Sequence, residues 1–124
     1  MEKCNCVFCK IVKGEIPCKK IFEDNDMLAF LDINPFKPGH VLIIPKEHTL
    51  DFQSIDEELL SKIIKRAKIL STHVVDKMNA DGYTIIQNNG NVQEVKHYHL
   101  HIIPKYVKDP TISLDEAFKK ITEE

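Results

Sequence analysis

The sequence predicts an α+β fold in which a mainly antiparallel sheet packs against one long helix, with a short helix near the N-terminus. Short runs of branched aliphatic and aromatic residues are separated by tight turns or loops, which is typical of strands joined as hairpins. Between residues 60 and 78 the apolar residues instead recur at the spacing of one helix face. The chain of 124 residues has the size of a single domain.

The first part of the chain contains one short predicted helix and three predicted strands. Residues 6–13 place apolar side chains at helical spacing, and Gly14 follows as a helix stop. A turn at residues 24–26 joins two strands, and the proline-rich residues 34–39 form a loop. The predicted strands are residues 19–23, 27–31 and 40–45. The last of these is rich in branched aliphatic residues, so we expect it to be buried.

The second part predicts the long helix, two strands and a short C-terminal helix. Ser54 and Glu57 match a capping box, in which a serine and a later glutamate satisfy each other's free amides. Asp81 and Gly82 are expected to end this helix, and a second capping box at residues 113–116 begins the last one. The predicted strands are residues 83–87 and 95–104.

The composition favours a folded protein that binds small ligands. Hydrophobic residues make up 43% of the chain, and 17 basic and 19 acidic residues give a formal net charge of -2. Without a basic excess we expect no nucleic-acid partner, and without a long apolar run we expect no membrane span. The first residues carry no apolar signal-like run, so we expect a cytoplasmic protein whose cysteines stay reduced.

His97, His99 and His101 alternate with aromatic and aliphatic residues in the last predicted strand. Residues at this spacing point to the same side of a strand, so three imidazoles should line one surface. They could be polar residues on a solvated face, ligands of one metal ion, or catalytic groups. Same-face neighbours are about 6.5 to 7 Å apart, which makes a shared ion awkward. As catalytic groups, one imidazole could attack phosphorus while another neutralises the phosphoryl oxygens.

Residues 97–103, which read HYHLHII, resemble the signature of the histidine triad (HIT) superfamily. The segments that resemble the family are residues 6–17, 21–48 and 93–105. The likeness is strongest to the Hint branch and its bacterial relatives. It implies a HIT-like fold and a single HIT domain over residues 1–124, with its core at residues 6–106 and a C-terminal tail at residues 107–124.

The resemblance also implies roles for the triad. His99 would attack an α-phosphate and form a nucleotidyl-histidine that water then cleaves. His101 would donate to the phosphate oxygens, and His97 would orient its neighbours. His40 and His73 have no role in this expectation.

The resemblance implies a nucleotide pocket beside the triad. Asp32 would bind the ribose hydroxyls, because residues 30–33 match the family's ribose-binding segment; from the local sequence alone it could equally be an ordinary residue at a strand end. The base slot would be lined by Phe8, Ile11, Phe30 and Ile33, which could also be simple core residues. The phosphate and leaving group would be met by Asn88, Gln93 and Glu94. A carboxylate repels phosphate, so recognition of the leaving group is the alternative for Glu94.

Cys6 and Cys9 form a Cys-x-x-Cys pair, a zinc signal that needs two further ligands. Resemblance to bacterial HIT proteins and related nucleotidyltransferases suggests His48 and His97. We therefore expect a structural zinc ion that holds the N-terminal helix against the triad strand. Cys4 is not expected to be a ligand, and no organic cofactor is expected.

The resemblance implies an enzyme that hydrolyses purine nucleoside phosphoramidates, with AMP or GMP derivatives as ligands. One alternative is a hydrolase of dinucleoside polyphosphates such as diadenosine tetraphosphate, as in the Fhit branch. A second alternative is a nucleotide-binding regulatory module with little catalysis. The resemblance further implies a homodimer formed through the long helix and the strand after Gly82.

Overall fold

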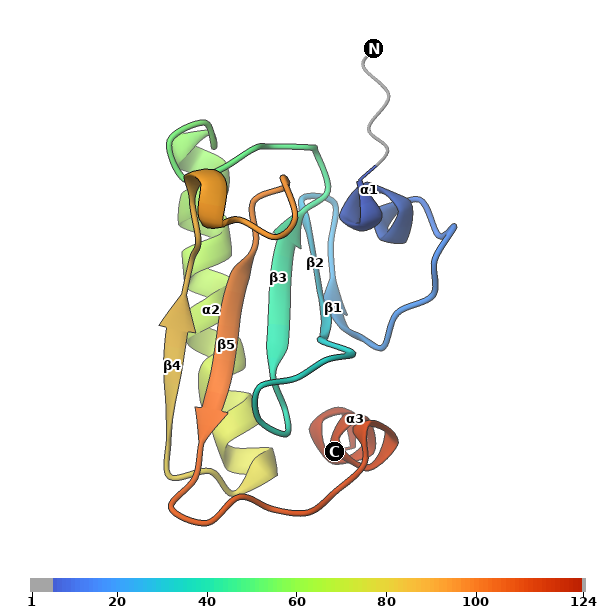
Figure 1. The fold of residues 1–124 in the computed structure, drawn as a ribbon, viewed down its shortest axis with the longest axis vertical. Coiled ribbons are helices and arrows are strands. Elements are labelled where there is room, and N and C mark those ends of the chain that lie inside the picture. The colour runs from blue at the N-terminus through green and yellow to red at the C-terminus, as the bar shows by residue number, and fades with distance from the viewer. Residues whose placement is uncertain (1–5, 124) are drawn as a thin grey trace.

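The computed structural model describes residues 6–123 and contains one sheet of five antiparallel strands (Figure 1). The order across the sheet is β1-β2-β3-β5-β4, so β3 and β5 are neighbours although α2 and β4 separate them in the chain. The strands are β1 (Lys20–Glu23), β2 (Met27–Leu31), β3 (Val41–Pro45), β4 (Gly82–Ile86) and β5 (Leu100–Lys105). The expected α+β fold with a mainly antiparallel sheet is confirmed.

Three helices and one 3-10 turn complete the fold. They are α1 (Val7–Val12), α2 (Glu57–Met78), η1 (Gly90–Val92) and α3 (Leu114–Thr122). In Figure 1, α2 runs along one face of the sheet. α1 lies beside the upper end of β2 in this view, and α3 lies near the loop between β2 and β3 at the lower end. Among the described residues, no helix combines the length and the apolar character needed to cross a membrane.

The main core lies between α2 and the sheet. Apolar residues spaced along one face of α2 are buried, as the helical spacing predicted. They pack against fully buried side chains that include Ile43 and Ile102 of the sheet and Tyr98 just before β5. A smaller cluster on the opposite face joins Phe8 of α1 to β2 and β3. The sheet is therefore covered by α2 on one face and partly by α1 on the other.

The beginning of α2 differs from the expected capping box. Asp56 is the N-cap, and its carboxylate accepts a hydrogen bond from the Leu59 amide at 3.1 Å. Ser54 does not cap the helix; its amide and hydroxyl both donate to the Asp51 carboxylate at 3.0 Å. The helix ends at Met78, where Asn79 adopts the left-handed conformation, rather than at Asp81. The capping box expected at the start of α3 is confirmed.

The last strand is shorter than expected. β5 begins at Leu100, whereas a strand was expected from residue 95. The pairing of β3 with β5 ends at Ile43 and Leu100, and the Tyr98 amide instead donates to the Thr49 carbonyl at 2.6 Å. His97 and His99 therefore precede the strand, and only His101 lies in it. Of the other strands, β2 has the expected bounds, β1 and β3 differ from expectation by one residue at one end, and β4 differs by one residue at each end.

Candidate active site and metal centre

The three histidines lie on the sheet face opposite α2. The side chains between them, Tyr98 and Leu100, are buried in the core beneath α2, so the alternation of sides continues beyond the end of β5. The ring centroids of His99 and His101 are 4.9 Å apart. The ring of Phe8 meets His97 and His99 edge to face at 5.8 and 5.0 Å. The local backbone thus brings the rings together without requiring one continuous strand.

The imidazole of His99 is held in one tautomer by the backbone. Its Nδ1 lies 2.8 Å from the carbonyl oxygen of His97, and a carbonyl can only accept, so Nδ1 donates. In the neutral ring Nε2 then carries a lone pair rather than a proton. The side chain is 6% exposed and lines a cleft. The lone pair of Nε2 is what an imidazole would need in order to act as a nucleophile.

His40 forms a hydrogen-bonded pair with His101 that the sequence analysis missed. The Phe36 amide donates to His40 Nδ1 at 3.2 Å, so the proton of neutral His40 sits on Nε2. His40 Nε2 lies 2.9 Å from Nδ1 of His101 and donates to it. The remaining proton of His101 is therefore on its Nε2. The two histidines come together because β3 pairs with β5, a long-range register that spacing along the chain does not reveal.

Burial keeps this pair neutral. Burial, with smaller contributions from the neighbouring His99 and His40 rings, lowers the pKa of His101 to about 4 against the opposing effect of Asp32. Burial also lowers the pKa of His40, with Asp32 again opposing. Asp32, His40 and His101 are close enough to hold a metal ion. However, the Phe36 amide leaves His40 with its proton on the nitrogen that would bind, so this group forms a hydrogen-bond relay instead.

A cleft of about 340 Å³ opens in front of His99 and His101. Its polar lining consists of Asp32, Asn34, Asn88, Glu94, His99 and His101. Among the described residues that line it, none is a lysine or an arginine. The cleft therefore offers imidazoles, amides and carboxylates to a ligand, but no permanent positive charge.

An apolar slot of about 180 Å³ adjoins the cleft, and Asp32 borders both. Four residues expected to form the base slot line it, namely Phe8, Ile11, Phe30 and Ile33. Of the loop residues expected near the phosphate, Asn88 and Glu94 line the cleft. Gln93 does not, because the turn η1 directs its side chain inward, where its amide donates to the Leu50 carbonyl at 2.6 Å. Gln93 thus supports the loop rather than facing the cleft.

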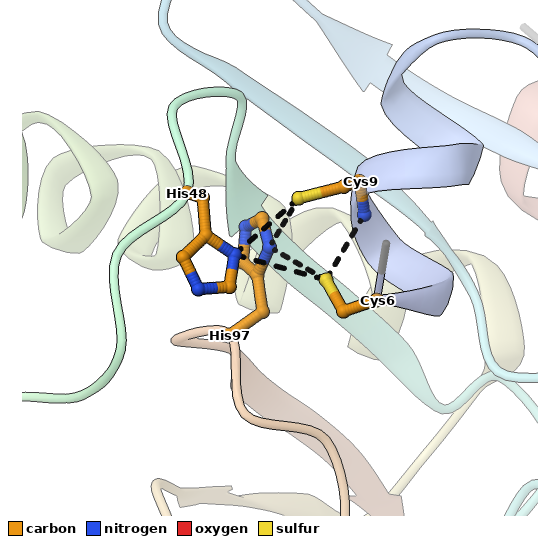
Figure 2. Close-up of side chains that lie close together, drawn as sticks. All are labelled: Cys6, Cys9, His48 and His97. Carbon is orange, nitrogen blue, oxygen red and sulfur yellow. Dashed lines mark hydrogen bonds between the residues drawn. The ribbon is translucent and has the colours of Figure 1, made fainter. Parts of the chain in front are cut away.

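Four sulfur and nitrogen atoms converge beside the cleft (Figure 2). Cys6 and Cys9 come from the start of α1, His48 follows β3, and His97 precedes β5. The Cys6 sulfur lies 3.8 and 3.4 Å from Nδ1 of His48 and His97, and the Cys9 sulfur lies 3.3 and 3.5 Å from the same atoms. Tetrahedral zinc with ordinary bond lengths would separate sulfur from nitrogen by about 3.6 Å. The expectation that the cysteines are reduced is not met at Cys9, which the structure records in a disulfide, so the set could hold a metal ion once that sulfur is reduced.

The surroundings of this group also suit a metal site. Nε2 of His97 donates to the Pro45 carbonyl at 2.9 Å, which leaves Nδ1 unprotonated and facing the sulfurs. The Cys9 amide lies 3.3 Å from the Cys6 sulfur and donates to it. Cys4 lies outside the described residues.

Known proteins similar to this chain carry the same domain. The model of the HIT domain family matches residues 13–108. An uncharacterized HIT-like protein of Methanocaldococcus jannaschii is 45% identical over 127 residues, covering 94% of this chain and 98% of that protein. An adenosine 5'-monophosphoramidase of Schizosaccharomyces pombe is 45% identical over 103 residues, covering 82% of this chain and 74% of that enzyme.

Solved structures agree with this fold. A zinc-bound histidine triad family protein from Mycobacterium smegmatis superposes with a TM-score of 0.87 at 32% identity, covering 95% of this chain and 91% of that one.

Proposed function

The chain belongs to the HIT family, and we propose that it hydrolyses purine nucleoside phosphoramidates at the α-phosphate with His99 as nucleophile. The observation that carries this proposal is the fixed tautomer of His99 at the wall of the cleft. Its relatives include enzymes named as adenosine 5'-monophosphoramidases, which are hydrolases.

The two cavities fit the parts of a nucleotide. The apolar slot would take the base between Phe8, Ile11 and the end of β2. Asp32 borders both cavities, where its carboxylate could accept hydrogen bonds from the ribose hydroxyls. The α-phosphate would then lie in the cleft before His99 and His101.

The reaction would proceed in two displacements. Nε2 of His99 attacks phosphorus, the bond from phosphorus to the amine nitrogen breaks as that nitrogen takes a proton from solvent and leaves as the amine, and a nucleotidyl-histidine forms. The His97 carbonyl, which accepts from Nδ1, stabilises the positive charge that develops on the ring. The Nε2 proton of His101 stabilises the phosphoryl oxygens. Water then displaces Nε2, so that overall its hydroxide ends on phosphorus and its proton on the amine.

The charge of the cleft favours an amine over a polyphosphate as leaving group. Asp32 and Glu94 line the cleft, and its described lining has no lysine or arginine to compensate them. At about 4 Å, two like charges at a partly buried site repel by roughly 4 kcal/mol. A polyphosphate leaving group would bring several negative charges toward Glu94. The lining therefore supports phosphoramidates over dinucleoside polyphosphates.

We also propose that Cys6, Cys9, His48 and His97 bind zinc. Four protein ligands would close the coordination shell, so the ion would hold α1 against the residues before β5 and take no part in the chemistry. The donor types, the distances and the zinc-bound relative support this assignment. Thiolate ligands need a reducing compartment, which is consistent with a cytoplasmic protein.

A homodimer through β4 and α2 is a further part of the proposal. β4 ends the sheet order, and its exposed residues include Tyr83 and Ile85, at 49% and 43% exposure. An edge strand with apolar side chains is suited to pairing with another copy.

The test is hydrolysis of adenosine 5'-phosphoramidate and diadenosine tetraphosphate by the wild-type protein and by His99→Ala. We expect faster AMP release from the phosphoramidate, a loss of roughly 10⁴-fold in the variant, and an adenylylated protein after denaturation at alkaline pH, where a phosphorus–nitrogen bond is stable. Preference for the dinucleotide would favour the Fhit-like alternative. Binding without turnover of either compound would leave the regulatory module as the function.

A further inference from the structure

The segment after β5 packs against the loop between β2 and β3, here called the β2–β3 loop (residues 32–40). The Tyr106 hydroxyl donates to the Pro38 carbonyl at 2.6 Å. Nζ of Lys37 lies 2.7 Å from the Asp109 carboxylate. In Figure 1 the chain leaves β5 and returns as α3 beside this loop. Two consecutive residues of the loop are thus held by the C-terminal segment of the same chain.

Phe36, in the same loop, contacts His40 through both its amide and its ring. The Phe36 amide donates to Nδ1 of His40, and the Phe36 ring stacks on the imidazole with centroids 5.5 Å apart and planes 17° apart. Phe36 is 70% exposed, so core packing does not hold its ring in place. Its position depends on the backbone of the β2–β3 loop, and the two C-terminal contacts attach directly after it.

Within the loop, the Asp32 amide donates to the His40 carbonyl at 3.0 Å, the His40 amide donates to the Lys37 carbonyl at 3.2 Å, and the Asn34 amide donates to the Asp32 carboxylate at 2.9 Å. Pro35 and Pro38 have no amide hydrogen to donate. Gly39 has a φ of +88°, and a Cβ there would lie 2.9 Å from Cγ of Met78. The end of the loop is therefore confined against α2, and Tyr106 and Asp109 add contacts from the C-terminal segment to the residues directly after Phe36.

We propose that Tyr106 and Asp109 are positioning residues for the hydrolysis. By holding the β2–β3 loop they keep Phe36 on His40, which keeps the His40 proton on Nε2 and the hydrogen bond to His101 formed. His101 then presents its own proton to the phosphoryl oxygens. The kinetic part of this inference rests on the proposed function, but the hydrogen bond itself does not.

The hydroxyl of Tyr106 is suited to this task. Burial, and to a lesser extent the Asp109 charge, raises the pKa of Tyr106 to about 12. The group therefore stays a donor throughout the neutral range. Its ring packs against the main core, so Tyr106→Phe removes the hydrogen bond and retains the packing.

The first experiment measures kcat, KM and the hydrogen-bonded ring proton of His40 in Tyr106→Phe. A lost neutral hydrogen bond corresponds to a change of up to about tenfold, so we expect kcat to fall roughly 5- to 10-fold. KM should change less than about twofold, since the base slot is untouched. The downfield proton resonance, identified by its absence in His40→Gln, should broaden or disappear because the bond opens to water.

Asp109→Ala and Asp115→Ala form a matched pair. Each removes an exposed carboxylate of the C-terminal segment that pairs with a lysine, but Asp115 pairs with Lys19, outside the loop, at 2.5 Å. Asp109→Ala should lower kcat about 2- to 3-fold, and Asp115→Ala should leave it unchanged. The double variant Tyr106→Phe with Asp109→Ala should lose at least about tenfold.

The proposal is overturned if the double variant keeps kcat within twofold of wild type, or if its ring proton resonance is unaltered. It is also overturned if Asp115→Ala lowers kcat as much as Asp109→Ala, since the segment would then act only through general stability. If the wild-type protein hydrolyses neither nucleotide, the proposed function fails, while the resonance still decides whether Tyr106 and Asp109 hold the relay.

Discussion

The two ends of the triad, His97 and His101, both have a lowered pKa but opposite surroundings. Burial lowers the pKa of each to about 4. His97 donates through Nε2 to a backbone carbonyl and turns Nδ1 toward two sulfurs and another imidazole. His101 accepts at Nδ1 from His40 and leaves Nε2 toward the cleft. What an imidazole can do is thus set by the partner of its other nitrogen, which the motif alone does not reveal.

The largest expected effect comes from removing the imidazole of His101, which lines the cleft. His101→Ala should lower kcat by roughly 10²- to 10³-fold, because a donor to the developing phosphoryl charge is lost. The amount of zinc per chain should stay at the wild-type value, since His101 is not one of the four proposed zinc ligands. Steady-state kinetics and elemental analysis of the same preparation test both points. Loss of metal together with activity would show that the two ends are not separate.

The second prediction concerns His48, the proposed zinc ligand beside His97. His48 is exposed, and its ring contacts His97, so His48→Ala should abolish stoichiometric zinc and lower Tm by roughly 10 °C. Elemental analysis and thermal unfolding are the measurements. Glu47→Ala, at the adjacent exposed position, is the control and should change neither. A variant that retained one zinc per chain would refute the assignment of His48.

The lowered pKa of His101 predicts that stability depends on pH. An unfolded histidine takes up its proton near pH 6.5, whereas His101 in the folded chain does so only near pH 4. Between these values the unfolded state binds more protons, so stability falls as pH falls through this window. We expect the free energy of unfolding to drop by roughly 1–2 kcal/mol from pH 7 to pH 5 through this group. Denaturant titrations at both pH values should show a smaller drop in His101→Gln; an equal drop would assign the effect elsewhere.

The smallest expected effect concerns Glu94, which lines the same cleft as His101. Glu94→Gln removes one negative charge from the lining and keeps the side-chain shape. Turnover of diadenosine tetraphosphate relative to adenosine phosphoramidate should rise roughly 3- to 10-fold, because repulsion of the polyphosphate is relieved. Competition between the two substrates in one reaction measures this ratio directly. An unchanged ratio would mean that Glu94 does not face the leaving group.

Local patterns in the sequence were sufficient to predict the helices and strands, but not all of the hydrogen bonds that their residues form. Helical spacing predicted α2, and the alternation around the triad predicted which side chains face the cleft. Ser54 was mistaken for the cap of α2, because the sequence does not say that Asp51 already binds it. His40 was missed because its partner lies 61 positions away, across a pairing of strands. Such contacts depend on register, which no short window of sequence contains.

For the candidate site residues, the expected identity was likewise easier to predict than the contacts. The resemblance supplied His48 as a ligand, since nothing near Cys6 and Cys9 in the chain indicates it, and the structure brings it to them. It also supplied Gln93, which the structure turns away from the cleft toward the Leu50 carbonyl. Family likeness thus indicated which residues matter, and the backbone around each determined how.

Phe8 stands between Cys6 and Cys9 in the sequence, and its ring forms part of both cavities while touching His97 and His99. On the proposed zinc assignment, the metal orders the helix that carries this wall, so a chain made without metal would present only part of its nucleotide site. The amount of competent enzyme in a cell would then follow the supply of zinc as well as the rate of synthesis.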